Sequence, residues 1–342
     1  MILTQDQQNI RDAVLKLCSR FPDEYWLERD RDGVFPHEFH QAMAADGWLG
    51  IAMPEQVGGA GLGITEAAIM MEAVAESGGG MAAASSIHGP VFSLQPIALF
   101  GTPEQQQRMI PPVLSGEHRI CFAVTEPNTG LDTTKLKTRA QKRDGGYLVN
   151  GEKIWISVAQ VANKMMLLAR TTPLEDVKRK TDGLSLFFTD LDRAKIEVRL
   201  IHKMGRHAVD SNMLFISDLW IPEEDRIGAE GDGFKTIMHG FNPERILIGS
   251  EAIGLGRVAI ARAARYARER IVFDRPIGMN QGIQHPLAKC WAQVEAANLM
   301  VMKAAALFDA GQECGVEANA GKYLAAEAGF EACHTALSTL GG

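Results

Sequence analysis

The chain has 342 residues, 46% of them hydrophobic and 23% charged, and its formal net charge is −7. This composition is typical of a globular protein with enough apolar surface for two or three domains. Acidic and basic residues are interspersed, so we expect no nucleic-acid-binding surface, which would need clustered positive charge.

The start of the chain and the cysteines indicate the compartment. The N-terminal stretch MILTQDQQNIRDAVLKL lacks the basic start and apolar run of a signal peptide, and no apolar stretch is long enough to cross a bilayer. The five cysteines are widely spaced and form no C-x-x-C motif. We therefore expect a cytoplasmic protein in a reducing compartment.

Residues 1–117 show the pattern of an all-α domain. Thr4 and Gln7 can form a capping box, after which apolar residues recur with helical spacing. The glycine cluster at 58–63 follows no strand, so we interpret it as a turn before a helix and not as a dinucleotide-binding loop. Glycines separate the further predicted helices, which cover residues 36–45, 65–76, 83–99 and 103–114.

Residues 118–230 are predicted to form a β domain. Asp-Gly-Gly at 144–146 and Asn-Gly at 150–151 supply turn residues that tolerate positive φ. Short strands separated by such turns predict a sandwich or a barrel. The β-rich runs begin at residues 121, 147, 164, 184 and 212.

Residues 231–342 return to a helical period, in long segments at about 243–270, 283–310 and 316–340. Helices, then strands, then helices argue against one doubly wound sheet, in which the two would alternate. We therefore expect an α+β chain of three packed domains. Because three helices leave the seam of a bundle uncovered, we also expect an incomplete bundle, with a truncated C-terminus or a partner helix.

Two segments of the β domain carry candidate binding residues. Residues 122–132, FAVTEPNTGLD, form a strand and a turn that could offer backbone N–H groups and the Thr125 hydroxyl to a flat polar ligand, although a plain hairpin turn explains them too. In residues 153–157, KIWIS, strand alternation places Trp155 and Ser157 on one face. They form a plausible platform for a heteroaromatic ring, although a strand tryptophan is also common in a core.

Two other features have plain structural explanations. Asn242 is a predicted N-cap with Pro243 in the first helical position, so the helix dipole alone favours Glu244 in the first turn. His37 and His40 share a helix face without a third ligand nearby in sequence. We predict a solvated histidine pair and no metal site.

The chain resembles the acyl-CoA dehydrogenase family. Residues 122–132 are similar to that family's aromatic residue, V-T-E-P run and G-S-D turn, and residues 150–157, NGEKIWIS, are similar to its N-G-x-K-x-W-I-T motif. Further family-like blocks follow the family's order: Pro54-Glu55 with Gly58 to Leu62, Gly101 to Gln105, Lys203 to Gly205, and Gly231 to Phe234.

The resemblance implies a flavoenzyme that holds FAD between its middle and last domains and oxidises an acyl-CoA to the 2-enoyl thioester, as in fatty acid metabolism. Leu131 stands where the family usually has a serine that contacts the coenzyme A arm. The residues that the resemblance assigns to the flavin come from the two signatures: Phe122, Val124, Thr125, Gly130, Trp155, Ile156 and Ser157.

The resemblance also implies a catalytic base. In isovaleryl- and long-chain-type members the catalytic glutamate lies directly before an arginine, in the helix that corresponds to the predicted helix at about 243–270. Glu244-Arg245 matches that pair. Glu244 would remove the α-proton while the β-hydrogen leaves as hydride to flavin N5. Asn242 matches a position that contacts the pantetheine, and Arg245 would hold coenzyme A phosphates or form a structural salt bridge.

The resemblance further implies a homodimer or homotetramer, with electron-transfer flavoprotein as the electron acceptor. Arg270, Phe273 and Gln281 match residues that reach the FAD of the neighbouring subunit. Gly341 and Gly342 match the glycines of the family's Q-x-F-G-G motif.

Two alternatives stay open. One is a flavin monooxygenase or oxidase on the same fold, in which oxygen reaches the reduced flavin. The other is a non-catalytic member retained as a binding or assembly subunit, which the short C-terminus and the departures at Leu131 and Ser338 make credible.

Overall fold

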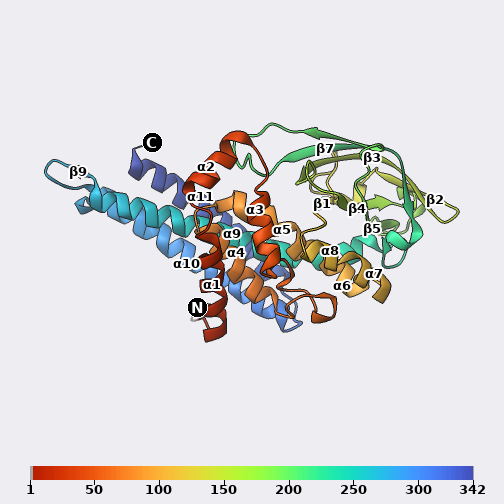
Figure 1. Cartoon of the computed structure of the whole chain (residues 1–342), viewed down its shortest axis with the longest axis horizontal. Coiled ribbons are helices and arrows are strands. Elements are labelled where there is room, and N and C mark those ends of the chain that lie inside the picture. Colours follow the sequence, from red (N-terminus) through yellow and green to blue (C-terminus); the bar gives the residue numbers. More distant parts are fainter. Residues whose placement is uncertain (1–2, 342) are drawn as a thin grey trace. The chain divides into compact units, whose positions relative to one another are not determined.

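The computed structural model describes residues 3–341, which Figure 1 shows as a cartoon. These residues divide into two compact units. Residues 28–61 and 85–241 form the sheet unit, and residues 3–27, 62–84 and 242–341 form the helical unit. No helix among the described residues combines the length and the apolarity that a membrane span requires.

The part of the chain before residue 118 is helical, as its periodicity predicts. α1 (Gln5–Cys18) begins at the predicted capping box. The Gln7 N–H donates to the Thr4 hydroxyl at 3.2 Å, and the Thr4 N–H donates to the Gln7 side chain at 3.1 Å. The other helices of this part are α2 (Asp23–Asp32), α3 (His37–Ala45), α4 (Ile64–Glu76), α5 (Gly80–Ser93), α6 (Gln95–Phe100), α7 (Pro103–Met109) and α8 (Pro111–Leu114).

The helices of this part differ from the prediction in three places. α2 has no counterpart in the sequence pattern because Trp26 is its only buried residue. The predicted helices 83–99 and 103–114 are each divided in two, before Pro96 and before Pro111. A proline has no N–H to donate to the carbonyl four residues earlier, so a helix readily ends there. The glycine cluster at 58–63 precedes α4, as predicted.

Among residues 3–341, eight strands form one connected sheet (Figure 1). Its order is β6-β7-β3-β2-β4-β5-β8, and β1 pairs with β4 in parallel. β2 and β4 share a single residue pair, Arg139 with Arg170, so the sheet consists of two halves. The strands are β1 (Ile120–Ala123), β2 (Arg139–Arg143), β3 (Gly146–Ser157), β4 (Lys164–Arg170), β5 (Leu184–Asp190), β6 (Ile196–Leu200), β7 (Ser211–Pro222) and β8 (Arg226–Ile227).

The apolar core of the sheet unit lies on both faces of β4. Met165 and Leu167 belong to a cluster that takes buried residues from β1 to β7. Met166 and Leu168 belong to a second cluster with residues of α6, α7 and α8. Burial on both faces explains why this strand appears in the sequence as an unbroken apolar run.

Two strands and one turn differ from the sequence pattern. β2 carries mostly polar residues, and β2 and β6 each bury only one residue, Ala140 and Ile196. Asn150-Gly151 is not a turn, because it lies inside β3 at a register shift against β7. A Cβ atom on Gly151 would lie 2.4 Å from the Thr138 hydroxyl, so the close approach of β2 requires glycine.

Residues 231–341 contain three long helices, α9 (Gly233–Glu269), α10 (Gln281–Asp309) and α11 (Gly315–Leu340). β9 (Ile271–Val272) and β10 (Arg275–Pro276) form a hairpin between α9 and α10 (Figure 1).

The predicted start of α9 is wrong, because the helix begins nine residues before Asn242, at Gly233, and continues through Pro243. Pro243 removes one backbone donor but does not end the helix. Glu244 therefore lies inside the helix and not in its first turn, where the dipole argument would apply. The division into domains at residues 117 and 230 stays a prediction.

Candidate active site

The two signature segments lie side by side at the end of β3. The Ile154 N–H donates to the Thr125 carbonyl oxygen at 2.9 Å. The register of β3 against β7 shifts between Lys153 and Ile156, and Trp155 within this bulge has a φ of 62°. Positive φ is uncommon for a residue with a side chain and is concentrated at functional sites. The bulge leaves the Trp155 side chain 60% exposed while Ile156 is buried.

A buried ion pair joins the same two segments. The Lys153 ammonium donates to the Glu126 carboxylate at 3.0 Å and to the carbonyl oxygens of Val124 and Leu168 at 2.9 and 2.8 Å. The Lys153 side chain is 0% exposed and that of Glu126 is 6% exposed. Burial lowers the pKa of Lys153 to about 8, although Glu126 opposes this shift.

Glu126 also anchors the loop that follows β1. Its carboxylate accepts the Lys137 N–H at 2.7 Å and the Thr138 N–H at 2.9 Å. Burial would raise the pKa of Glu126, but Lys153 and these N–H donors outweigh it and hold the pKa below its ordinary value. The loop between these contacts carries Gly130 and Leu131 on the surface, and Leu131 is fully exposed.

The other residues of the first signature differ in how accessible they are. Phe122 is half-buried, and its ring centroid lies 5.1 Å from that of Phe92 and 6.4 Å from that of Phe241. Val124 is buried and Thr125 is half-buried. Thr125 therefore offers more accessible polar surface than Val124 does.

Ser157, the last residue of β3, contacts Arg206, a residue that no sequence motif identifies. Arg206 donates to the Ser157 hydroxyl at 3.3 Å. The same guanidinium donates to Ser85 at 2.9 Å and to Ser211 at 3.4 Å. Ser85 and Ser157 are far from Arg206 in sequence, and no spacing rule predicts that the fold brings them together.

The candidate base and its neighbours lie inside α9. Glu244, Asn242 and Arg245 are all half-buried. Arg245 donates to the Asn242 side-chain oxygen at 3.0 Å, so the two predicted coenzyme A contacts are bonded to each other. This bond fixes the residues on either side of Glu244.

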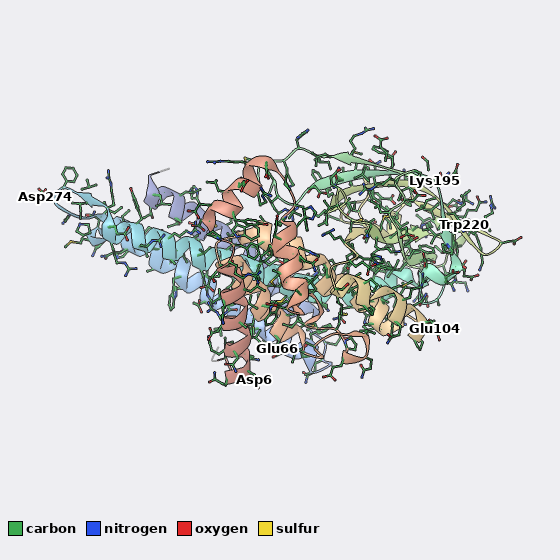
Figure 2. The ribbon with its side chains drawn as sticks, in the orientation of Figure 1. Asp6, Glu66, Glu104, Lys195, Trp220 and Asp274 are labelled. Carbon is green, nitrogen blue, oxygen red and sulfur yellow. The ribbon has the colours of Figure 1, made fainter. Side chains whose placement is uncertain are left out.

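The residues predicted to reach a neighbouring subunit lie in or next to the segment that connects α9 with α10. Arg270 directly follows α9, Phe273 lies in the turn of the hairpin, and Gln281 opens α10. Phe273 is 92% exposed, and Figure 2 shows Asp274 at the tip of the hairpin. Phe273 and Asp274 have φ values of 51° and 59°, which a two-residue hairpin turn requires and an aspartate tolerates.

The predicted terminal glycines lie at the end of α11. Gly341 ends α11 with a φ of 104°, and its N–H donates to the Leu337 carbonyl oxygen at 3.1 Å. This is the conformation that glycine commonly adopts after a helix. Gly342 lies outside the described residues.

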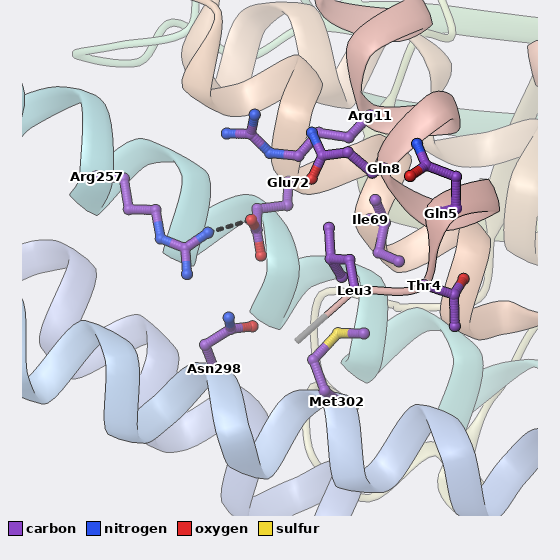
Figure 3. Close-up of a pocket in the computed structure, with 10 residues that line it drawn as sticks. All are labelled: Leu3, Thr4, Gln5, Gln8, Arg11, Ile69, Glu72, Arg257, Asn298 and Met302. Atoms are coloured by element: carbon purple, nitrogen blue, oxygen red, sulfur yellow. Dashed lines mark hydrogen bonds and ion pairs between the residues drawn. The ribbon is translucent and has the colours of Figure 1, made fainter. Parts of the chain in front are cut away.

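A separate cavity of about 480 Å³ lies in the helical unit (Figure 3). None of the predicted site residues is among its described lining residues. Its polar lining residues are Thr4, Gln5, Gln8, Arg11, Glu72, Arg257 and Asn298. Arg257 forms ion pairs with both Glu72 and Glu295. Burial raises the pKa of Glu72 to about 7, although Arg257 opposes this shift. The cavity is therefore distinct from the candidate active site.

The predicted histidine pair is only partly solvated. His40 is 2% exposed, so the prediction of a solvated pair is wrong for this residue. Burial lowers the pKa of His40 to about 4. Within residues 3–341, no group of three or more histidine, cysteine, aspartate or glutamate side chains is placed to hold a metal ion.

Comparisons with known proteins cover nearly the whole chain. Models of the acyl-CoA dehydrogenase N-terminal, middle and C-terminal domains match residues 4–117, 121–219 and 231–342. The acyl-CoA dehydrogenase FadE12 of Mycobacterium tuberculosis is 33% identical over 351 residues, which cover 100% of this chain and 87% of that protein.

Two solved structures share the fold along the whole chain. Butyryl-CoA dehydrogenase from Megasphaera elsdenii has a TM-score of 0.93 at 28% identity, covering 100% of this chain and 89% of that one. A chain in a structure of the electron transferring flavoprotein of Acidaminococcus fermentans has a TM-score of 0.94 at 29% identity, with the same coverage. The chain belongs to the acyl-CoA dehydrogenase family and is an oxidoreductase of that family.

Proposed function

We propose that this protein binds FAD against the end of β3 and oxidises an acyl-CoA to its 2-enoyl thioester. Trp155 carries the proposal, because it is 60% exposed at a φ of 62° and lies beside the Thr125 segment. Backbone strain of this kind persists only where the surroundings hold it in place, and it marks ligand sites. A flat ring that covers the indole would give the strain a function.

The accessible groups around Trp155 suit a flavin. The indole offers an apolar face, and the hydroxyls of Thr125 and Ser157 offer hydrogen bonds to a polar ring edge. We assign Ser157 to the N5 edge of the ring, and Leu131 to the coenzyme A arm. When bound, FAD would accept the two electrons of the oxidation.

We assign the catalytic base to Glu244. The α C–H of a thioester is a weak acid, so a positioned carboxylate and hydrogen bonds to the carbonyl oxygen are both needed. Glu244 is half-buried, which leaves a carboxylate oxygen accessible, and the Arg245–Asn242 hydrogen bond holds the helix residues around it. Asn242 and Arg245 would contact the coenzyme A part of the substrate.

We also propose a homodimer or homotetramer in which Arg270, Phe273 and Gln281 contact the FAD of a neighbouring subunit. The exposure of the hairpin supports this assignment, since Phe273 has almost no contact within its own chain. Gly341 and Gly342 would approach the adenine end of FAD. The proposed electron acceptor is an electron-transferring flavoprotein.

Anaerobic flavin bleaching tests the cofactor, the reaction and the base together. Protein loaded with FAD is mixed with a panel of acyl-CoAs, and flavin absorbance is followed. We expect bleaching in the wild type and a rate roughly 10²–10⁴-fold lower in Glu244→Gln, because a positioned general base contributes about that factor. Glu269→Gln, at the end of the same helix, is the matched control and should bleach at the wild-type rate.

Three outcomes would contradict the proposal. Glu244→Gln that keeps FAD and bleaches at the wild-type rate excludes Glu244 as the base. Rapid reoxidation of the bleached wild type by air favours an oxidase or monooxygenase. A wild-type protein that takes up no FAD favours a non-catalytic binding or assembly subunit.

A further inference from the structure

Arg206 joins three serine hydroxyls at one end of the sheet. Its guanidinium donates to Ser85 of α5 at 2.9 Å, to Ser157 at the end of β3 at 3.3 Å, and to Ser211 at the start of β7 at 3.4 Å. Ser85 and Ser211 are buried, while Ser157 is half-buried. Two of the contacts therefore hold the guanidinium in place, and the third lies at the edge where the flavin is assigned.

The loop before β7 fixes the backbone of Arg206. Arg206 has a φ of 56°, a left-handed conformation that is uncommon for a residue with a side chain. The Lys203 ammonium donates to the carbonyl oxygens of Gly205, Arg206 and Val209. His207 contacts the Lys203 carbonyl oxygen at 2.8 Å. These contacts stabilise the loop conformation in which the guanidinium reaches Ser157.

The chemistry of the two groups sets the direction of the Ser157 proton. A guanidinium only donates hydrogen bonds, so the Ser157 oxygen must accept from Arg206. The Ser157 O–H is then directed away from Arg206 and is available as a donor to another group. Ser157 lies on the same side of β3 as the exposed Trp155, with the buried Ile156 between them.

Arg206 also brings a positive charge to this edge. Arginine stays charged at every pH at which proteins are folded. Charge within a few ångströms of a partly buried site stabilises negative charge on a bound ligand strongly. A flavin gains negative charge when it is reduced, so a cation behind Ser157 would favour the reduced and anionic forms.

We propose that Arg206 is a positioning residue that raises the reduction potential of the bound flavin by stabilising negative charge on the reduced ring, and that it orients the Ser157 hydroxyl as a donor toward the oxidised ring. This inference rests on the proposed function, because it places the flavin at Ser157. The residue is not assigned contact with the flavin or with the substrate.

Sulfite binding and the reduction potential of the FAD-loaded protein test this role. Sulfite adds through its sulfur to flavin N5 and leaves a negative charge on the ring, so its affinity reports how well the site stabilises that charge. We expect Arg206→Gln and Arg206→Met to bind FAD but to bind sulfite at least about ten-fold more weakly, with a lowered potential. Arg206→Lys keeps the charge and should recover part of the affinity.

Arg193→Gln is the matched control. Arg193 donates to the carbonyl oxygens of Ala159, Gln160 and Ala162 at 2.6, 3.2 and 3.1 Å and so holds a loop of the same unit. Its loss should change thermal stability but not sulfite affinity. A purely structural Arg206 would behave in the same way.

The outcomes separate the two proposals. If either neutral Arg206 variant loads FAD and keeps the wild-type potential and sulfite affinity, Arg206 has no electronic role. If the wild-type protein takes up no FAD, the proposed function itself fails. Using two neutral variants keeps the test valid if one of them does not fold.

Discussion

At the residue scale, the buried Lys153–Glu126 pair is one of the contacts between the two signature segments. Replacing Lys153 with methionine leaves the Glu126 carboxylate buried without its cation. We expect Lys153→Met to lower the free energy of unfolding by about 3–5 kcal/mol, because breaking a buried pair costs more than the pair contributes. Urea unfolding followed by circular dichroism measures this loss.

A surface pair on the same sheet provides the control. Lys164 contacts Asp190 at 2.5 Å, but the Asp190 side chain is 73% exposed. Lys164→Met should therefore lower the free energy of unfolding by less than about 1 kcal/mol. The double variant Glu126→Gln with Lys153→Met should recover part of the loss, because no buried charge remains. If Lys153→Met and Lys164→Met lower the free energy of unfolding by similar amounts, the buried pair contributes no more to stability than the surface pair.

The sequence predicts some of these residues and not others, for a physical reason. Strand alternation predicts that Trp155 and Ser157 share a face, but it does not predict the register shift between Lys153 and Ile156, which interrupts that alternation at Trp155. The partner of Lys153 and the position of Arg206 depend on segments that only the folded chain brings together. A local pattern carries no information about such contacts, so the sequence does not reveal them.

At the scale of elements, Asp309 completes the start of α4. The N-cap residue is Gly63, which has no side chain to cap the helix. Asp309 instead accepts the N–H groups of Ile64 and Thr65 at 2.7 and 2.8 Å and the Thr65 hydroxyl at 2.6 Å. A carboxylate at a helix N-terminus satisfies donors that have no partner within the helix.

Removing this cap should destabilise the helical unit. We expect Asp309→Ala to lower the free energy of unfolding by about 1–2 kcal/mol, the range typical of a lost capping side chain. Urea unfolding measures the change. Asp6→Ala, in the first turn of α1 (Figure 2), is the control and should cost roughly 0.3–1 kcal/mol at most. An Asp309 variant as stable as the Asp6 variant would contradict the capping role.

The elements that the sequence predicts well are those whose period continues for several turns or strand residues. α10, α11 and the apolar strands β4 and β5 begin and end within a few residues of their predicted bounds. The predicted start of α9 is wrong because a proline is typical of a first helical position, whereas α9 begins at Gly233 and includes Pro243 in its interior. β2 and β6 were not predicted because half or more of the residues in each strand are exposed to solvent, so neither strand forms an apolar run in the sequence.

At the scale of the whole molecule, the order of helices, strands and helices follows from the change of hydrophobic period along the chain. The membership of the two compact units does not. Residues 28–61 and 85–117 belong to the sheet unit, although their period is helical like that of residues 62–84. Periodicity shows which face of a helix is buried, but not which other element buries it.

The last prediction concerns how the stability of the whole chain depends on pH. Glu72 is 7% exposed and contacts Arg257 (Figure 3). Arg257 also pairs with Glu295, so the three residues link α4, α9 and α10. The pKa of Glu72 is about 7 in the folded protein, above the ordinary value of 4.5. Between these two pH values the folded state retains a proton that the unfolded state releases. The contribution of this proton to the free energy of unfolding is fully present below pH 4.5 and is lost as the pH rises through 7.

We therefore expect the free energy of unfolding to fall by roughly 1–3 kcal/mol between pH 5 and pH 8 through Glu72 alone. Glutamine cannot ionise, so Glu72→Gln should reduce this fall, as seen in urea unfolding at the two pH values. Glu76→Gln is the control, because Glu76 pairs with Arg11 on the same helix face but is more exposed, at 26%. If the fall with pH is equal in all three proteins, Glu72 is ionised throughout, and Arg257 outweighs the cost of its burial.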